Sequence, residues 1–338
     1  MYNNTAIKYV INWLNFSLVI IIIMVVVGAI TRLTQSGLSM PDWKPITGII
    51  PPINNEQWKV AFDEYKKFPE FNKVNFNIEL SEYKTIYYWE YTHRMLGRFI
   101  GLLFLFPFVF FLFKKILNPN LIRRLLYLFM MGAFQGVMGW YMVKSGLVDN
   151  PYINHLRLAV HLFIAFIIIA YIYWTKLILT YPDQNNNNYI TYNKFINFII
   201  CLFFIQIVYG AFTAGLKAGQ NWNTFPLMEG RFIPDGLFFL KPICLNFFEN
   251  DKMIQFIHRF LGLFLLLLIY LFSFKMKDLP LKYNLRVRSL VTIVSCQVFL
   301  GIITLISKVP IVLGVAHQFL AIILLLLLLD IKHSLKYK

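Results

Sequence analysis

The order of apolar and polar positions along the chain predicts a membrane protein made of helices. A helix that crosses a bilayer needs about 20 mostly apolar residues, and such runs recur along the whole sequence. The eight predicted spans are Trp13–Ile30, Tyr87–Phe113, Leu121–Val143, His155–Leu179, Phe195–Leu216, Met253–Phe274, Arg286–Ile306 and Ile311–Ile331. We therefore expect an all-α integral membrane protein with eight transmembrane helices in the lipid bilayer.

Charge then gives the chain a direction in the membrane. Hydrophobic residues make up 58% of the chain and charged residues 14%, against about 45–50% and about 25% in soluble domains. The segments on the side of both termini carry 15 Lys and Arg and 3 acidic residues, whereas the other side carries 14 and 12. By the positive-inside rule both termini are expected in the cytoplasm, with loops 32–86 and 217–252 outside. The net charge of +16 thus orients the chain and does not indicate nucleic-acid binding.

The sequence contains an internal duplication of four spans. The matched segments are Val27–Thr31 with Tyr209–Thr213, Thr92–Gly97 with Ile257–Gly262, Gln135 and Gly139 with Gln297 and Gly301, and Ala159–His161 with Val315–His317. An even number of spans gives both halves the same orientation, as in membrane folds with parallel repeats. We expect two tandem four-helix bundles related by a pseudo-twofold axis, one over residues 1–184 and one over 185–338.

Four histidines follow this repeat and indicate haem. They are His93, His161, His258 and His317, each about six residues inside the outer end of a predicted span, or roughly 9 Å along a helix. Two imidazoles facing each other across a bundle are the usual axial pair of a b-type haem. An interhelical hydrogen-bonding role and zinc binding are the alternatives. Of the other two histidines, we expect His155 at the interface and His333 in the cytoplasmic tail.

Arginines near the histidines are candidates to bind haem propionates, because a guanidinium suits carboxylates well. They are Arg94 and Arg259, which directly follow a histidine, with Arg157 one turn outward of His161 and Arg98 deeper in the second span. The alternative is snorkelling to the membrane surface.

The two halves differ at one carboxyl group. Glu90 lies three residues before His93, where the second half has Gln255 before His258. A buried carboxyl can act as an acid, a base or a stabiliser of positive charge, which favours chemistry in the first half and electron transfer in the second. The alternative is an i,i+4 salt bridge between Glu90 and Arg94.

With these residues the chain resembles the haem A synthase family, in the branch of proteobacteria and mitochondria. The segments that carry the resemblance are Gly28–Ser39, Asp42–Gly48, Glu90–Arg98, Arg157–His161, Trp222–Met228 and His258–Gly262. Another branch has a Cys pair in the first outer loop. Residues 32–86 contain no Cys here, so a redox role for such a pair does not carry over.

The resemblance implies an oxidoreductase that converts a methyl group of haem O to a formyl group, giving haem A by successive hydroxylations. It implies that His93 and His161 hold the substrate and product haem, that His258 and His317 hold haem b, and that Glu90 assists the oxidation. One of His93 and His161 must release the iron, or the oxidation avoids oxygen binding there; the sequence leaves both open. A haem O synthase is the expected partner; the electron donor and self-association stay open.

Two other functions remain as alternatives. The first is a di-haem electron-transfer protein that does not modify haem, and the second is a transporter with parallel repeats. Glu90 and the outer-loop segments favour the enzyme. No Arg-rich amphipathic segment precedes the first span, which favours a bacterial inner membrane over a mitochondrial one. The haem sites are expected toward the periplasmic side.

Overall fold

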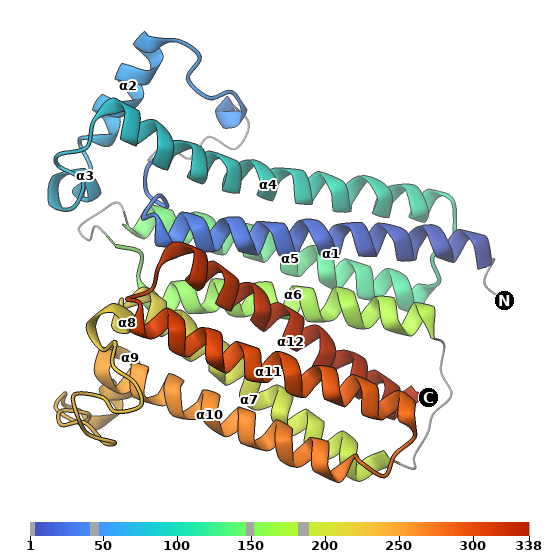
Figure 1. Cartoon of the computed structure of the whole chain (residues 1–338). Coiled ribbons are helices and arrows are strands. Elements are labelled where there is room, and N and C mark those ends of the chain that lie inside the picture. Colours follow the sequence, from blue (N-terminus) through green and yellow to red (C-terminus); the bar gives the residue numbers. More distant parts are fainter. Residues whose placement is uncertain (1–3, 41–46, 147–151, 182–188, 338) are drawn as a thin grey trace. The chain divides into compact units, whose positions relative to one another are not determined.

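The computed structural model describes residues 4–40, 47–146, 152–181 and 189–337 (Figure 1). Within these ranges the chain is helical, and its one β-type pairing is an isolated bridge between Met228 and Arg231. The all-α prediction is therefore confirmed. The segment Asp42–Ile46 and the predicted boundary between 184 and 185 lie outside the described residues.

Eight helices of the described ranges are long and apolar enough to cross a membrane. They are α1 (Asn4–Leu33), α4 (Leu80–Phe113), α5 (Pro119–Gly146), α6 (His155–Thr180), α7 (Ile190–Gly215), α10 (Asp251–Lys275), α11 (Leu281–Ile306) and α12 (Ile311–Tyr337). Each contains nearly all of one predicted span. Most are longer than predicted because polar turns at their ends continue the helix beyond the apolar run.

The difference from prediction that matters most for the histidines is the start of α4. It begins at Leu80, well before the predicted Tyr87, because Glu79 and Glu82 form a capping box at its N-terminus that satisfies backbone N–H groups. His93 consequently lies 13 residues inside its helix, whereas His161 and His317 lie six residues inside theirs. The helix start is thus not a guide to depth for all four histidines.

The extra turns of α4 pack against the loop between α1 and α4, which we call the first outer loop after its predicted side. It forms the helices α2 (Asn55–Tyr65) and α3 (Pro69–Lys73) and the turn η1 (Thr47–Ile49). Figure 1 shows α2 and α3 at the end where α4 begins. The buried residues that join them are Met40, Trp58, Phe62, Tyr65, Tyr83 and Tyr87, and we refer to these as the outer aromatic cluster. Apolar positions of this loop and of the first turns of α4 thus build a small core.

The second outer loop contains the short helices α8 (Ala218–Asn221), η3 (Ile243–Leu245) and α9 (Asn246–Glu249). Two buried amides hold it together. Asn250 donates to the carbonyl groups of Gly236 and Leu237, and Asn246 donates to that of Leu240. These bonds satisfy backbone acceptors of the loop, including the carbonyl group of the buried Leu237.

The chain divides into two compact units, Val19–His161 and Met1–Leu18 together with Leu162–Lys338. In the second unit α7 packs against α10, α10 against α11, α11 against α12, and α12 against α7, which closes a four-helix bundle. In the first unit α4 packs against α5. The pseudo-twofold relation, the division at 184/185 and the cytoplasmic position of both termini stay predictions.

Candidate functional site

The four repeated histidines form two pairs, one in each unit. His93 on α4 and His161 on α6 are close enough to interact electrostatically, and so are His258 on α10 and His317 on α12. The structure therefore brings together the same partners that the sequence repeat suggested. The other two histidines are elsewhere.

Those other two are both buried. His155 is the first residue of α6. His333 was expected in a cytoplasmic tail after the last span, but it lies within α12, which continues to Tyr337; its side of the membrane stays a prediction. Its ring packs edge-on against Trp174 at 5.4 Å between ring centroids. The tail prediction failed because the polar residues after Asp330 extend the helix.

A glycine on the preceding helix lies against each imidazole of the two pairs. A Cβ atom would lie 3.1 Å from a ring atom of His93 if placed on Gly28, and 3.4 Å from one of His161 if placed on Gly139. The corresponding distances are 3.1 Å for Gly210 and His258, and 2.8 Å for Gly301 and His317. A larger residue at Gly28, Gly210 or Gly301 would therefore press on the imidazole, whereas at Gly139 its Cβ would only touch the ring.

The donor set of both pairs fits haem. Each unit offers two imidazoles, and ring nitrogens of His161, His258 and His317 are buried without a hydrogen-bond partner among the described residues. Nε of Arg259 is also buried without a partner there. Neutral imidazoles are haem-iron ligands, and an unpaired buried N–H of arginine suits an anionic group such as a propionate. The groups of three or more His, Cys, Asp or Glu that zinc would need are absent from the described residues.

Glu90 and Arg94 form a buried ion pair on the outer half of α4. Arg94 Nη2 lies 2.5 Å from Glu90 Oε1, and their side chains are 6% and 3% exposed. The i,i+4 salt bridge that the sequence left as an alternative is therefore present. It does not exclude a chemical role for the carboxylate.

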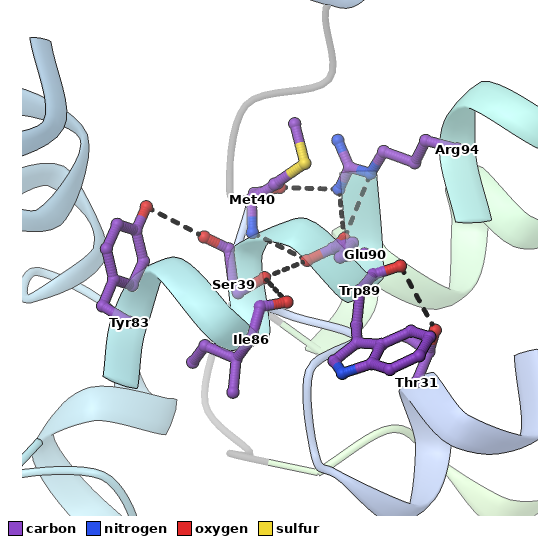
Figure 2. Close-up of polar contacts among 8 residues, drawn as sticks. All are labelled: Thr31, Ser39, Met40, Tyr83, Ile86, Trp89, Glu90 and Arg94. Atoms are coloured by element: carbon purple, nitrogen blue, oxygen red, sulfur yellow. Dashed lines mark hydrogen bonds and ion pairs between the residues drawn. The ribbon is translucent and has the colours of Figure 1, made fainter. Parts of the chain in front are cut away.

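The same pair holds the end of the first described loop segment (Figure 2). Glu90 Oε2 accepts hydrogen bonds from the Ser39 hydroxyl at 2.8 Å and from the Met40 N–H at 2.7 Å. Arg94 Nη2 donates to the Met40 carbonyl at 2.6 Å. We call these four residues the loop clamp. It fixes the segment that follows α1 beside His93.

The equivalent position in the second unit is built without a carboxylate. Gln255 is 3% exposed, as Glu90 is, and Gln255 Oε1 has no hydrogen-bond partner among the described residues. Arg259 donates instead to the carbonyl groups of Thr224 at 2.7 Å and Pro226 at 3.2 Å. In both units the arginine after the histidine thus binds the backbone of an outer loop, a contact that the sequence did not indicate.

The remaining two arginines lie apart from these clamps. Arg157 stacks over the ring of Tyr141 at 4.6 Å from its centroid. Arg98 donates to the sulfur of Met95 at 3.4 Å, a long contact. The stacking contact of Arg157 does not use its guanidinium N–H groups, which suit an anionic ligand.

Three glutamines near the histidines were not identified as functional from the sequence. Gln135, Gln206 and Gln297 each donate a hydrogen bond from Nε2 to the backbone carbonyl of a paired histidine. The detectable signal was a Gln four residues before each of Gly139, Gly210 and Gly301. Only the first and last of these pairs entered the repeat comparison.

The whole chain is similar to known proteins. The model of the family COX15-CtaA, described as cytochrome oxidase assembly protein, matches residues 11–329. A protein of Flavobacterium johnsoniae named heme A synthase is 45% identical, covering 94% of this chain and 95% of the relative. Proteins of the same name from Nitrosospira multiformis and Ehrlichia canis are 43% and 41% identical, each covering 96% of this chain and 92% of the relative.

Proposed function

The chain belongs to the COX15-CtaA family of cytochrome oxidase assembly proteins, and on that premise we propose that it is a haem A synthase. The reaction is the oxidation of a methyl group of haem O to a formyl group, which gives haem A for terminal oxidases. The name heme A synthase of the similar proteins supports this proposal. The observation that carries it is the pairing of His93 with His161 beside the Glu90 carboxylate.

In this proposal the two units have different tasks. His93 and His161 hold the substrate haem, and His258 and His317 hold a resident haem b that supplies one-electron transfer when bound. The replacement of Glu90 by Gln255 in the second unit supports the division. A neutral amide has no charge with which to stabilise a developing cation or to accept a proton.

Glu90 acts on the methyl carbon of the substrate through its negative charge. Oxidation of that carbon develops positive charge and releases protons. A carboxylate can stabilise the positive charge and can accept a proton. Arg94 keeps the carboxylate in one orientation, and the N–H of Met40 and the hydroxyl of Ser39 fix its second oxygen. Successive hydroxylations of the same carbon require that the Glu90 carboxylate keeps the same position relative to that carbon.

The arginines and outer loops bind each haem within its own unit. Arg98, Arg157 and the free Nε of Arg259 bind propionates, together with the side of Arg94 that faces away from Glu90. The outer aromatic cluster excludes water above the first site, since it buries Trp58, Tyr83 and Tyr87. Both sites lie toward the periplasmic side of a bacterial inner membrane, and a haem O synthase supplies the substrate.

The test is to express the full chain in a host that makes haem O and to identify the extracted haem. We expect formyl-bearing haem A or its hydroxymethyl precursor, with haem b in the same preparation. Haem b alone, from a host with verified haem O, would contradict the proposal. That result would favour the di-haem electron carrier, which needs the same histidines but leaves the methyl group intact.

A further inference from the structure

The four helices that precede the histidine helices share one pattern. Each has a glycine against an imidazole and, four residues earlier, a longer side chain one helical turn away. The pairs are Met24 and Gly28 on α1, Gln135 and Gly139 on α5, Gln206 and Gly210 on α7, and Gln297 and Gly301 on α11. Methionine replaces glutamine in one of the four.

The three glutamines act as braces between neighbouring helices. Their Nε2 atoms donate to the carbonyl of His161 at 3.0 Å, of His258 at 2.9 Å and of His317 at 3.0 Å. Each accepting carbonyl belongs to the histidine itself. The brace therefore fixes the backbone from which an iron ligand extends.

Met24 occupies on α1 the place that Gln206 occupies on α7. A Cβ on Gly97, one turn after His93, would lie 3.6 Å from Cε of Met24. A Cβ on Gly262, one turn after His258, would lie 3.1 Å from Nε2 of Gln206. The two side chains have similar length, but a thioether carries no N–H. The carbonyl of His93 thus cannot receive this brace.

The missing bond makes movement of His93 cheaper than movement of the other three ligands. Interhelical side-chain hydrogen bonds in membranes average about 0.6 kcal/mol, with about 1.7 kcal/mol as the largest values. These two free energies correspond to roughly a threefold and a twentyfold change in an equilibrium constant. Methionine also adapts its shape to a moving neighbour, because it has three rotatable bonds.

We propose that His93 is the axial ligand that releases the substrate iron during turnover, that His161 stays bound, and that Met24 is the positioning residue that permits it. This inference rests on the proposed haem A synthase function. The iron–nitrogen bond breaks, the neutral imidazole keeps its electron pair, and no electron or proton moves. The proposal thus names His93, and not His161, as the ligand that leaves the iron with an open coordination position.

The experiment exchanges the two side chains and measures carbon monoxide binding to the reduced, purified full-length protein. Six-coordinate bis-histidine haem excludes carbon monoxide, so the reactive fraction reports ligand release. The formyl group shifts the absorption of the first haem away from that of haem b, so each site is read separately. Met24→Gln should lower the reactive fraction at the first site about threefold or more, and turnover should fall with it.

The reverse exchange and one control complete the design. Gln206→Met should raise the carbon monoxide reactivity of haem b by a similar factor. Ile23→Gln places the same amide on the neighbouring α1 position, which is 43% exposed, and should change neither site. If Met24→Gln fails to fold, Gln135→Leu serves instead, and it should raise the reactivity of the first site by freeing His161.

The outcomes separate this inference from the proposed function. Unchanged carbon monoxide reactivity in a haem-loaded Met24→Gln protein, or in Gln135→Leu, overturns the role of Met24 and leaves the haem A synthase proposal standing. Full retention of the first-site haem after both His93→Ala and His161→Ala would instead show that these histidines do not bind the substrate haem, and the proposed function itself would fail.

Discussion

At the residue scale, Glu90 combines a chemical charge with a structural clamp. Its Oε1 is bound by Arg94, and its Oε2 holds Ser39 and Met40. The buried pair is sensitive to loss of either partner, because a lone buried charge costs several kcal/mol. The two roles can be separated by substitutions that differ in what they remove.

Glu90→Gln removes the charge and keeps the size of the side chain. We expect haem A formation to fall at least about 100-fold, the usual contribution of a general acid or base. Ser39→Ala removes only one clamp bond, worth about 1 kcal/mol, and should retain most activity. Haem extracted per mole of protein gives the measurement. Equal losses in both variants would mean that Glu90 serves the loop alone.

Glu70 on α3 gives the outer loop a pH dependence. It is 4% exposed and accepts a hydrogen bond from Tyr65 Oη at 3.1 Å, and Asn75 Nδ2 donates to the same Oη at 2.8 Å. Burial first, and the charge of Glu90 second, raise the pKa of Glu70 to about 8. The folded loop therefore binds this proton more tightly than the unfolded loop, in which the pKa is about 4.3.

The sign follows from this difference. Protonated Glu70 stabilises the folded loop fully below about pH 4, and the contribution is lost as the pH rises through about 8. We compare the rate at which a protease cleaves residues 32–86 at pH 9 with the rate at pH 7. This ratio of rates should be about tenfold larger for the wild-type protein than for Glu70→Gln. Glu64→Gln, at an exposed residue of the same loop, should keep the wild-type dependence. A pH dependence that survives Glu70→Gln would contradict the assignment.

At the scale of helices, the glycines set how closely two of them approach around an imidazole. Gly301→Ala would put a Cβ 2.8 Å from the His317 ring. Such overpacking costs about 1–3 kcal/mol, and we expect a lower haem b content and a shifted haem b spectrum. Gly101→Ala is the matched control, since its Cβ would meet nothing within 4 Å. Normal haem b in Gly301→Ala would show that the ring can move aside.

The sequence predicted the helices well because length and apolar content alone decide whether a segment can cross a bilayer. It placed the start of α4 too late, because Ser81, Glu82 and Lys84 interrupt the apolar run while the capping box continues the helix. It also paired the histidines through their repeat. The contacts of Arg94 and Arg259 with loop carbonyls were not predictable, because no residue pattern marks which backbone oxygen a guanidinium will reach.

The spacing of Gln206 and Gly210 was visible in the sequence, but the sequence could not show that Gln206 bonds to a histidine carbonyl. A Gln four residues before a Gly is common, and its role depends on which carbonyl lies opposite. The substitution of Met24 in this position becomes informative only once Gly97 and Gly262 are seen beside the two side chains. The contact of Glu90 with Ser39, 51 positions away in the sequence, likewise becomes apparent only in the structure.

At the scale of the whole molecule, the native cysteines can test the orientation. Cys244 lies in the second outer loop, is exposed and forms no disulfide within the described residues. A membrane-impermeant thiol reagent should label it in spheroplasts, where the periplasmic face is open, and Cys244→Ser should abolish that labelling. Cys201 and Cys296 lie within α7 and α11 and should stay unlabelled by it. Labelling of Cys244 only in inverted vesicles would reverse the orientation.

The ion pair on α4 also bears on how the protein enters the membrane. Glu90 and Arg94 are neighbours on one helix, so the two charges can neutralise each other before any other helix is present. Arg259 on α10 has no acidic neighbour at the matching position, and its partners are carbonyl groups of the second outer loop. An uncompensated arginine deep in a helix costs about 2.5–3.5 kcal/mol on insertion. The charge of Arg94 is therefore compensated within the second span itself, whereas the side chain of Arg259 meets its carbonyl partners only once the loop ahead of the sixth span has folded.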